Sequence, residues 1–475
     1  MSEKTLFITG SISYPNGLPH IGHAYEAIAS DALARFYRLA GWDIYFTSGT
    51  DDHGQKMVQT AKGEGVSAQA LADRLTPAFK DMGEILNCTH DDFIRTCEPR
   101  HIKSVQALWR RIADSGAIYK DIYKGWYSVR DEAFYTGDEI IEGEAGQKQA
   151  PDGSPLEWLE EESYFFRLSD FQQPLLDFYE ANPNFIQPES RRNEVIAFVK
   201  GGLHDLSISR TAFDWGVPVP DDPAHVVYVW LDALANYISV LEYPDEKSQL
   251  FSKYWDNVLH IIGKDIIRFH AVYWLAFLMA AKLPLPTRVF AHGFLTVDGE
   301  KMSKSLGNVL APAPLAEHYG VDPLRYFFLR EVPFGRDGSF SDEAIVNRVN
   351  ADLANDLGNL AQRCLSMIAK NFDGITPAYA NPTAEDEALL ALFDDLLPAA
   401  EKAMAECQIH LYIGGVMEAV SAANRYFANS SPWDYKQGAE NENIERMGTI
   451  LYCAADAVRQ AAILLQPVIP EGAGR

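Results

Sequence analysis

The sequence predicts an α/β protein with a parallel sheet, a smaller inserted domain and a helical C-terminal domain. Strand-like and helix-like segments alternate over residues 4–115 and again over residues 226–292. Between these stretches the sequence changes to aromatic residues interleaved with polar ones, as in a domain with its own strands. From residue 344 onward nearly every segment has helical spacing, which is typical of a helix bundle. We therefore expect a sheet assembled from two separated halves of the chain.

The composition is that of an ordinary soluble globular protein. The chain has 475 residues, of which 47% are hydrophobic and 23% charged, enough for several domains and a large core. The first residues lack a signal-peptide layout, and the longest apolar run, around residues 269–281, is too short to span a membrane. These observations predict a cytoplasmic protein with no membrane partner.

Charge and cysteine content exclude further classes of function. The formal net charge of −25 argues against broad polyanion binding, so any contact with nucleic acid must be local. None of the five cysteines forms a CxxC pair, which predicts buried free thiols rather than a disulfide framework or a zinc knuckle.

The stretch Thr5–His23 predicts a buried strand, a turn and the start of a helix. The apolar run Leu6–Ile8 suits a parallel strand, and a helical pattern covers residues 24–39. Free backbone N–H groups and the positive end of the helix dipole make such a turn a phosphate site. Neither a Walker loop nor a dinucleotide fingerprint is present. Instead two histidines flank Gly22, where a flat ligand such as adenine can approach the backbone.

A second strand, residues 43–48, ends in the turn Gly49–Gly54. Ligands of open α/β sheets gather at the carboxyl ends of strands, so this turn should share the crevice of the first one. The remaining elements predicted for this part are helices over residues 67–86 and 99–116, strands over residues 226–230 and 258–262, and helices that begin near Asp232 and Asp265.

Residues 293–308, GFLTVDGEKMSKSLGN, predict a hairpin turn at Asp298-Gly299 and then a short polar loop with two lysines. Such a loop can close over a phosphate chain, because lysines and histidines stabilise charge on a transferring phosphorus and its leaving pyrophosphate. Taken singly, the histidine pair is more often structural and the lysines are more often solvated surface residues.

The two motifs together carry more weight. HIGH followed much later by KMSKS, with an insertion between them and helices after, resembles class I aminoacyl-tRNA synthetases. Within that class, the stretches SYPNGLPHIGHAY, GTDDHG, YVWLDALANY, IGKDIIRFHAVYW, KMSKSLGN, NADLANDLGNLAQR and SSPWDYK resemble the methionyl-tRNA synthetase family. The resemblance covers nearly the whole chain.

The resemblance implies a Rossmann-like parallel-sheet catalytic domain with an inserted connective domain, followed by an α-helical bundle that binds the anticodon. The expected boundaries are residues 1–116 for the first half of the catalytic domain, 117–225 for the connective domain, 226–292 for the second half, 293–343 for the KMSKS loop and connecting domain, and 344–475 for the anticodon-binding domain.

The implied activity is that of a methionine–tRNA ligase. The methionine carboxylate attacks the α-phosphorus of Mg-ATP, giving methionyl-adenylate and pyrophosphate; the 3′ adenosine of tRNA(Met) then takes the methionine and AMP leaves. Catalysis should come from positioning and charge stabilisation rather than from a protein nucleophile. The resemblance implies His20, His23, Lys301 and Lys304 as catalytic residues, and Tyr14, Asn16, Gly22, Lys264, Asp265 and Lys304 as ATP-binding residues.

Methionine presents a polarizable thioether, which packs well at aromatic edges, and an ammonium group, which needs a paired charge once desolvated. By resemblance, Asp51 holds the ammonium and Arg210 joins its charge network. The expected lining comprises Ile12, Tyr14, Trp230, Ala233, Leu234, Tyr237, Ile266, Phe269, His270 and Trp274. For any one aromatic, an ordinary core position is an equal alternative. Many family members have proline where Leu234 stands, so that wall can differ here.

The helical domain should bind the tRNA through local contacts. Residues 346–475 carry 9 Lys and Arg against 17 Asp and Glu, so recognition should rest on stacking and base-edge hydrogen bonds. Asn355, Asn359 and Arg363 follow at i, i+4 and i+8 along one helix face, and Trp433 offers an aromatic platform. By resemblance they read the CAU anticodon, including that of the initiator tRNA. Interhelix hydrogen bonding is the alternative for Asn359 and Arg363.

Residues 117–225 contain no cysteine, whereas many family members bind zinc there through cysteine knuckles. We therefore predict no structural zinc and no other metal site, with residues 137–147 as a reduced knuckle held by turns. The chain also lacks the C-terminal extension by which some members dimerise or bind tRNA, so a monomer is expected.

Two rival functions remain open. A small-molecule nucleotidyltransferase shares the HxGH turn, but lacks a helical domain and KMSKS at this spacing. A catalytically silent tRNA-binding paralogue is separated from an enzyme only by an activity measurement. Sister synthetases for Cys, Val, Ile or Leu are disfavoured, because no cysteine-type zinc site is visible and an insertion of about a hundred residues holds no large editing domain.

Overall fold

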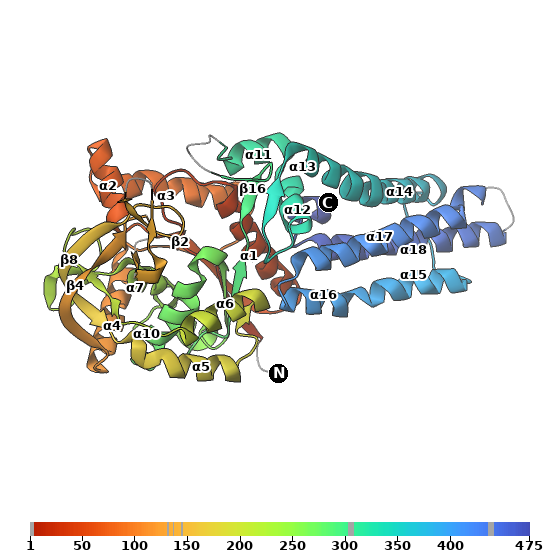
Figure 1. The fold of residues 1–475 in the computed structure, drawn as a ribbon. Helices are drawn as coiled ribbons and strands as arrows, with labels where there is room; N and C mark the ends of the chain where they lie inside the picture. Colours follow the sequence, from red (N-terminus) through yellow and green to blue (C-terminus); the bar gives the residue numbers. More distant parts are fainter. Residues whose placement is uncertain (1–3, 131–132, 136, 144–145, 303–307, 436–440) are drawn as a thin grey trace. The chain divides into compact units, whose positions relative to one another are not determined.

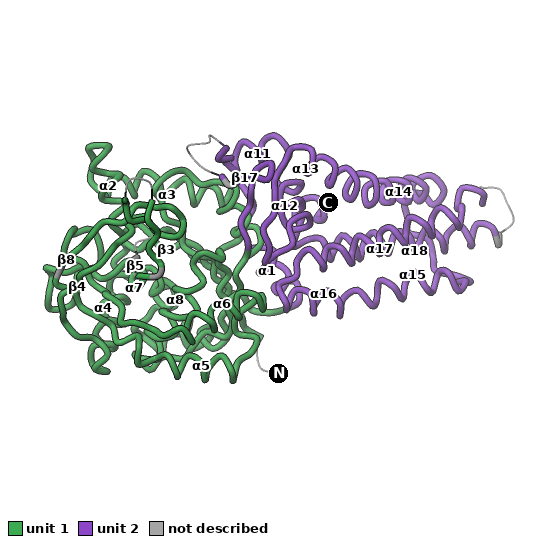
Figure 2. The backbone as a smooth tube through the Cα atoms, in the orientation of Figure 1, with its two compact units in different colours: residues 1–30, 41–84, 88–292 green, residues 31–40, 85–87, 293–475 purple. Residues whose placement is uncertain are grey.

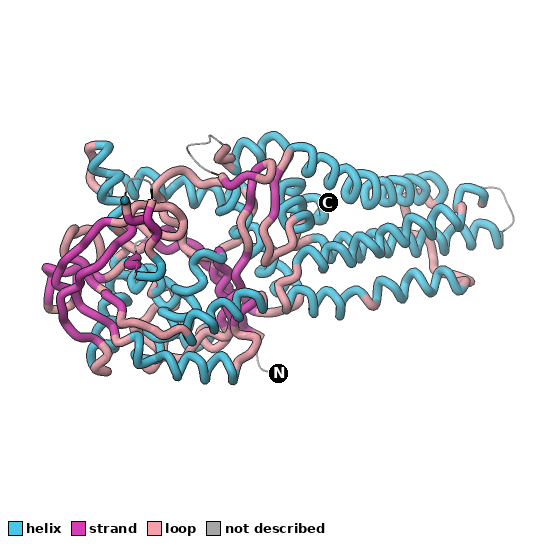
Figure 3. The backbone as a smooth tube through the Cα atoms, in the orientation of Figure 1, coloured by secondary structure: helices cyan, strands magenta, loops and turns pink. Residues whose placement is uncertain are grey.

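The computed structural model describes residues 4–130, 133–135, 137–143, 146–302, 308–435 and 441–475 (Figure 1). The chain divides into two compact units (Figure 2). Unit 1 comprises residues 1–30, 41–84 and 88–292, and unit 2 comprises residues 31–40, 85–87 and 293–475. Most strands lie in unit 1 and most of unit 2 is helical, as Figure 3 shows. The five domain boundaries expected from the sequence stay a prediction.

A six-stranded sheet forms the centre of unit 1, and all its pairings are parallel. Its order is β3 (Asp92–Arg95), β2 (Asp43–Thr50), β1 (Thr5–Thr9), β14 (Val258–Gly263), β15 (Arg288–His292) and β9 (Ile186–Gln187). Strand β1 pairs with β2 on one side and β14 on the other, so both halves of the chain meet there. The predicted fold class, with a sheet built from two separated halves, is confirmed.

Two features of the sheet differ from expectation. Residues 226–230 are not a strand of the parallel sheet: β13 (Asp222–Val227) pairs with β11 (Ser209–Arg210) and β12 (Pro218–Val219), and α7 (Val229–Leu234) follows it. The prediction failed because a short apolar run does not distinguish a buried strand from a buried helix. In addition, β9 comes from the segment expected to be a separate insertion, yet it forms the sheet edge beside β15.

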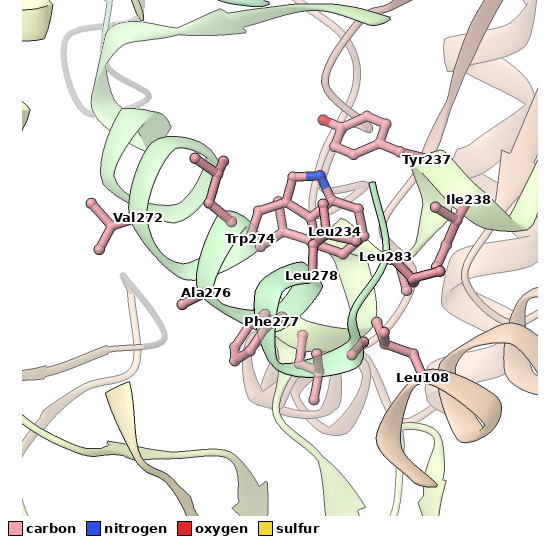
Figure 4. Close-up of a cluster of buried hydrophobic side chains, with 14 of the residues drawn as sticks. Leu108, Leu234, Tyr237, Ile238, Val272, Trp274, Ala276, Phe277, Leu278 and Leu283 are labelled. Atoms are coloured by element: carbon pink, nitrogen blue, oxygen red, sulfur yellow. The ribbon is translucent and has the colours of Figure 1, made fainter. Parts of the chain in front are cut away.

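Besides α7, the helices of unit 1 are α1 (Ile21–Leu39, whose second half belongs to unit 2), α2 (Gln55–Glu64), α3 (Ala68–Ile85), α4 (Pro99–Asp114), α5 (Gln172–Ala181), α6 (Glu189–Lys200), α8 (Asn236–Ser239), α9 (Gln249–Tyr254) and α10 (Trp274–Ala281). Helices α1, α3 and α4 lie where the sequence predicts them, with shifts of up to three residues at their ends, whereas α2, α5, α6, α8 and α9 were not predicted. The sequence of α10 is apolar on every side, and the helix is accordingly buried in the core, where Trp274 packs near Leu234 and Tyr237 (Figure 4).

The inserted segment has its own antiparallel sheet, as its alternating aromatic and polar residues predict. The strands are β10 (Leu206–Ser207), β8 (Glu157–Phe166), β4 (Ile118–Ser128) and β5 (Ala133–Tyr135). In the expected reduced knuckle, residues 137–147, strand β6 (Ile141–Glu142) pairs with β7 (Lys148–Gln149), which directly follows it, and Glu144 and Ala145 lie outside the described residues. Among the described residues no group of three His, Cys, Asp or Glu is placed to hold a metal ion; the expected lack of zinc stays a prediction.

Unit 2 opens on the predicted hairpin. Strands β16 (Leu295–Val297) and β17 (Glu300–Lys301) pair across Asp298 (φ 51°) and Gly299 (φ 82°). Positive φ at both central residues is the geometry that an Asp-Gly turn favours, because it matches the twist of the strands. Strand β18 (Gly338–Phe340) completes this small sheet, and helices α11 (Pro312–Tyr319) and α12 (Val321–Glu331) lie between β17 and β18 in the chain.

The C-terminal bundle contains the four predicted helical stretches, two of them modified. The first consists of α13 (Asp342–Arg348), the π-helical segment η6 (Val349–Gly358) and α14 (Asn359–Asn371). The second is divided at Asp395 into α15 (Ala384–Asp394) and α16 (Leu396–Ala405), since Pro398 is tolerated only in the first turn of a new helix. The others are α17 (Ile409–Ser430) and α18 (Asn441–Leu465), and α19 (Pro470–Gly474) ends the chain.

Helix α18 is long and apolar enough to cross a membrane by length and composition alone, over residues 443–465. The sequence reasoning overlooked it, because Glu445, Arg446 and Arg459 interrupt its apolar runs. Here 56% of its most apolar window is buried within the protein, and α18 packs against α14, α15 and α17. This is the environment of a bundle core helix.

A fully buried arginine joins the distant segments of unit 2. Arg325, on α12, donates to Oδ2 of Asp31 (2.7 Å) and to the carbonyl oxygens of Leu86, Pro467 and Val468 (3.0 Å each). These partners lie on α1, in the loop after α3 and after the end of α18. The arginine therefore explains why residues 31–40 and 85–87 group with unit 2.

Replacing Arg325 with Met should lower the free energy of unfolding by about 3 kcal/mol, because the buried carboxylate of Asp31 would lose a fully buried charge partner. Urea unfolding of wild type and variant measures the loss. Adding Asp31→Asn should restore part of it, since the unpaired charge is then removed; equal stability of the single and double variants would contradict this account.

Candidate active site

The turns after β1 and β2 lie side by side. The backbone N–H of Ser13 donates to the carbonyl of Gly49 (2.9 Å), and the N–H of Asp51 donates to the carbonyl of Ser13 (2.8 Å). Only glycine fits at position 49, because a Cβ there would lie 2.2 Å from the backbone oxygen of Ile94 on β3 and 2.9 Å from Cγ2 of Ile12. Ile12 and Tyr14 are thereby placed beside Asp51, at the edge of the sheet where the sequence predicts a shared crevice.

His20 and His23 stack at the start of α1, with ring centroids 3.9 Å apart. The backbone N–H of His20 donates to Nδ1 of His23, and the N–H of Gly22 donates to Nδ1 of His20 (3.1 Å each). Because Nδ1 accepts in both rings, the proton of each neutral imidazole is assigned to Nε2. Burial, together with the neighbouring His20, lowers the pKa of His23 to about 3. His23 is therefore a neutral N–H donor at neutral pH rather than a cation.

Aromatic residues of α7 and of the segment after β14, which we call the aromatic slot, belong to the predicted methionine lining. Trp230 stacks on Phe269 with a centroid distance of 3.6 Å and an interplanar angle of 6°. Nδ1 of His270 lies 3.0 Å from the carbonyl oxygen of Ile266, which can only accept, so this nitrogen carries the proton. Tyr237 then donates its hydroxyl proton to Nε2 of His270 (2.8 Å). Burial lowers the pKa of His270 to about 4, so the slot holds no charge there.

The residues of the predicted methionine lining differ in how deeply they are buried. Partly exposed members are Ile12, Tyr14, Trp230, Ile266 and Phe269, and buried members are Ala233, Leu234, Tyr237, His270 and Trp274. Leu234 and Trp274 belong to the hydrophobic core, where Figure 4 shows them near Tyr237. For Trp274 the structure thus shows the core position that was the alternative to a place in the methionine lining. Contact of these residues with methionine stays a prediction.

The acidic turn contains two carboxylates with different surroundings. Asp52 is fully buried and accepts from Nε of Arg95 (2.7 Å) and the hydroxyl of Thr76 (3.1 Å), while Trp215 donates to its carbonyl (2.6 Å). It is a structural residue of the turn. Asp51 is buried beside it at the sheet edge, which suits a carboxylate that pairs with a ligand's ammonium.

Lys264 and Asp265 form the first turn after β14, in the short 3₁₀ helix η4 (Lys264–Ile266). Since β14 runs parallel to β1, this turn lies at the same edge of the sheet as the histidine pair. Arg210 lies farther back, on β11, where it is buried and donates to the hydroxyl of Ser207 (2.9 Å) and the carbonyl of Ser209 (2.7 Å). Its predicted link to the methionine site stays a prediction.

One of the two lysines of the KMSKS motif lies within the described residues. Lys301 ends β17, where its backbone pairs with Thr296, and Lys304 lies outside the described residues. Their predicted contacts with ATP stay predictions from the sequence.

Part of the predicted anticodon surface is assembled within unit 2. Arg363 lies over the rings of Phe427 (5.0 Å) and Trp433 (5.6 Å), and 43% of Trp433 is exposed. Asn359 and Arg363 are both exposed on α14, four residues apart on one face. Asn355 is exposed too, but it lies in the π-helical segment, whose wider turns break the four-residue spacing used in the prediction.

The family model described as tRNA synthetases class I (M) matches residues 6–365. The chain belongs to this family. It is 58% identical over 473 residues to a methionine–tRNA ligase of Brucella suis biovar 1, covering 100% of this chain and 91% of that relative. A relative of the same name from Mycobacterium bovis is 53% identical over 472 residues, covering 99% and 91%.

Solved structures of this family have the same fold as this chain. The Mycobacterium tuberculosis methionyl-tRNA synthetase in complex with methionyl-adenylate has a TM-score of 0.97 at 53% identity, covering 99% of this chain and 92% of that one. The free form of the Mycobacterium tuberculosis enzyme has a TM-score of 0.90 at 50% identity, covering 99% and 91%. The predicted family and fold class are thereby confirmed.

Within this class I synthetase chain, one buried cluster escaped the sequence reasoning. Both carboxylate oxygens of Asp232 are bound by histidines: Nδ1 of His53 lies 2.6 Å from Oδ2, and Nε2 of His101 lies 2.7 Å from Oδ1. The sequence contained a signal, because Asp232 is the one charged residue in the run YVWLDALANY, whose other residues except Asn236 are apolar or aromatic. A buried acid in such a run requires partners, but the sequence does not name them.

The histidine pair predicts a pH effect on stability. The pKa of His23 is about 3 when folded against about 6.5 when unfolded, so below pH 6.5 the unfolded chain binds a proton that the folded chain does not. The stabilisation is complete above pH 6.5 and decreases as the pH falls toward 3. We expect His23→Gln to lose less unfolding free energy between pH 7 and pH 5 than wild type, measured by urea unfolding at both pH values. The exposed His204→Gln serves as control; equal losses in the His23 variant and wild type would exclude the assignment.

Proposed function

We propose that this chain charges tRNA(Met) with methionine in two steps at the sheet edge of unit 1. As a member of its family with relatives at 58% identity along its full length, it acts as a methionine–tRNA ligase, a class I aminoacyl-tRNA synthetase. The observation that carries the site assignment is local. The turns after the neighbouring parallel strands β1, β2 and β14 carry the parts of the proposed site. These are the histidine pair after β1, the carboxylate of Asp51 after β2, and aromatic slot residues after β14.

In the first step, a carboxylate oxygen of methionine attacks the α-phosphorus of ATP and pyrophosphate leaves. We propose that His20 and His23 donate hydrogen bonds from Nε2 to phosphate oxygens as negative charge develops, which a neutral N–H can do without a change of protonation. Gly22, Tyr14, Asn16, Lys264 and Asp265 are proposed to hold the nucleotide, and Lys301 and Lys304 the leaving pyrophosphate. ATP is proposed to bind as its magnesium complex, so that Mg²⁺ arrives with the substrate.

The lack of charge in the aromatic slot is proposed to select methionine over amino acids with charged side chains. A thioether packs at aromatic edges without needing a charge partner, whereas a charged side chain would be desolvated beside neutral His270. The ammonium group is proposed to pair with the buried carboxylate of Asp51. In the second step, a hydroxyl of the tRNA's 3′ adenosine attacks the adenylate carbonyl and AMP leaves.

We propose that unit 2 reads the anticodon of elongator and initiator tRNA(Met) through Asn355, Asn359, Arg363 and Trp433. The stack of Arg363 on an exposed tryptophan supports this, because planar groups of this kind receive unpaired bases. A monomeric state and a cytoplasmic location are proposed from the composition of an ordinary soluble chain.

Pyrophosphate–ATP exchange with each of the twenty amino acids tests the function. Methionine alone should drive label from pyrophosphate into ATP. Exchange without any amino acid would favour a nucleotidyltransferase, and no exchange at all would favour a silent paralogue; either result overturns the proposal.

Lys304→Ala should reduce the rate of methionyl-adenylate formation by about 100-fold, because the leaving pyrophosphate loses a positive charge. The dissociation constant of methionine should stay unchanged, since no pyrophosphate is present in that complex. Single-turnover adenylate formation and equilibrium methionine binding measure the two effects. Lys103→Ala, at an exposed position on α4, is the control, and an equal loss of binding and rate would refute the assigned role.

Trp433→Ala should lower kcat/KM for tRNA charging by about 10–100-fold, as expected for loss of one stacked base, and leave pyrophosphate exchange unchanged. Aminoacylation and exchange assays on the same preparation separate the effects. Trp433→Phe keeps an aromatic face and should retain most of the charging activity. A parallel loss in exchange would instead indicate damage to the catalytic unit.

A further inference from the structure

The cluster around Asp232 gathers three segments of unit 1 that are far apart in the sequence. Asp232 lies on α7, His53 in the turn after β2, and His101 on α4. All three side chains are buried, and both oxygens of the carboxylate are occupied at 2.6 and 2.7 Å. Asp232 therefore has no surface with which to contact a substrate.

The hydrogen bonds around His101 and Asp232 hold the cluster together and favour the ionised form of Asp232. Ser239 has one hydroxyl proton and donates it to the carbonyl of Ala235 (2.8 Å), so it accepts from Nδ1 of His101 (3.0 Å). His101 contacts Asp232 through Nε2 and Ser239 through Nδ1, so its ring is held on both sides. Burial favours the neutral acid and would raise the pKa of Asp232, but His53 and His101 oppose it and the net pKa is lowered. The bonds at Asp232 are accordingly charge-assisted, the stronger kind of hydrogen bond.

Helix α7 needs such an anchor. It is only six residues long, and its N-terminal cap, Tyr228, makes no side-chain hydrogen bond to the helix. A helix of this length has no stability of its own, so tertiary contacts must hold it. Asp232 is its one charged residue, and it is tied to a strand-end turn and to α4.

The two ends of this anchor correspond to the two ends of the amino-acid site. Helix α7 carries Trp230, Ala233 and Leu234, which form one wall of the aromatic slot. His53 follows Asp51, the ammonium-pairing residue, by two positions in the same turn. In the methionine site proposed above, the distance between Asp51 and these residues of α7 limits the length of the substrate side chain.

We propose that Asp232 is a positioning residue that sets the length of amino acid accepted by this site, by holding α7 at a fixed distance from the Asp51 turn through His53 and His101. The proposal rests on the methionine site proposed above.

The test is Asp232→Asn, which keeps the shape of the side chain but removes its charge and one acceptor. In pyrophosphate exchange, KM for methionine should rise about tenfold, whereas KM for ATP should change less than about twofold, because small displacements of a positioning element weaken binding and rate this strongly. The preference for methionine over ethionine, which is one methylene longer, should fall severalfold. A rigid pocket distinguishes substrates that differ by one methylene by about 10–200-fold, and this discrimination falls when α7 is no longer held in place.

Two further variants separate positioning from stability. Ser239→Ala removes the outer partner of His101 without touching Asp232, and should reduce the methionine-to-ethionine preference in the same direction but to a smaller extent. Asp386→Asn removes another fully buried carboxylate, bound by Arg446 and Tyr426 in unit 2. It should lower the unfolding midpoint and leave the preference for methionine unchanged.

An unchanged preference in folded Asp232→Asn, or equal rises in both KM values, would overturn the proposal. If Asp232→Asn does not fold, the ratio measured with Ser239→Ala decides in its place. Absence of methionine-dependent exchange in the wild type would instead contradict the proposed function itself, so the two failures are distinguishable.

Discussion

The pairing of β1 between β2 and β14 is the constraint on which the catalytic unit depends. Parallel neighbours end at the same edge, so the turns after these strands are gathered although the chain between them is long. The histidine pair follows β1, the acidic turn follows β2, and the slot residues follow β14. The apolar run of β1 suits this central place in the sheet, because both faces of the strand are covered.

A second principle of the site is the separation of charged from neutral surfaces. Burial keeps His23 and His270 neutral by lowering their pKa values; in the proposed function His23 donates to phosphates and His270 lines the methionine side chain. Two neighbouring carboxylates are bound within the protein, since Asp52 binds Arg95 and Asp232 binds two histidines. The proposed methionine site therefore has a polar end at Asp51 and an apolar end at the aromatic residues.

Unit 2 carries the residues proposed to bind the anticodon, although its C-terminal part is acidic. Two of its arginines are bound within the protein, Arg325 to Asp31 and Arg446 to Asp386. A third, Arg363, lies over the ring of Trp433 and forms a planar surface with it. Such a surface favours unpaired bases over a duplex backbone, which agrees with the negative charge of this part of the chain.

The sequence by itself determined β1, the histidine turn, the Asp-Gly hairpin, the bundle and the family, because these depend on periodicity and turn chemistry within short windows. Tertiary structure alone decided that residues 229–234 form a helix, that β9 closes the sheet edge, and that Arg363 meets Trp433. It also decided the partners of Asp232, which lie 131 and 179 positions away in the chain. Burial demands that a carboxylate be paired, but which distant groups pair with it is fixed only when the whole chain packs.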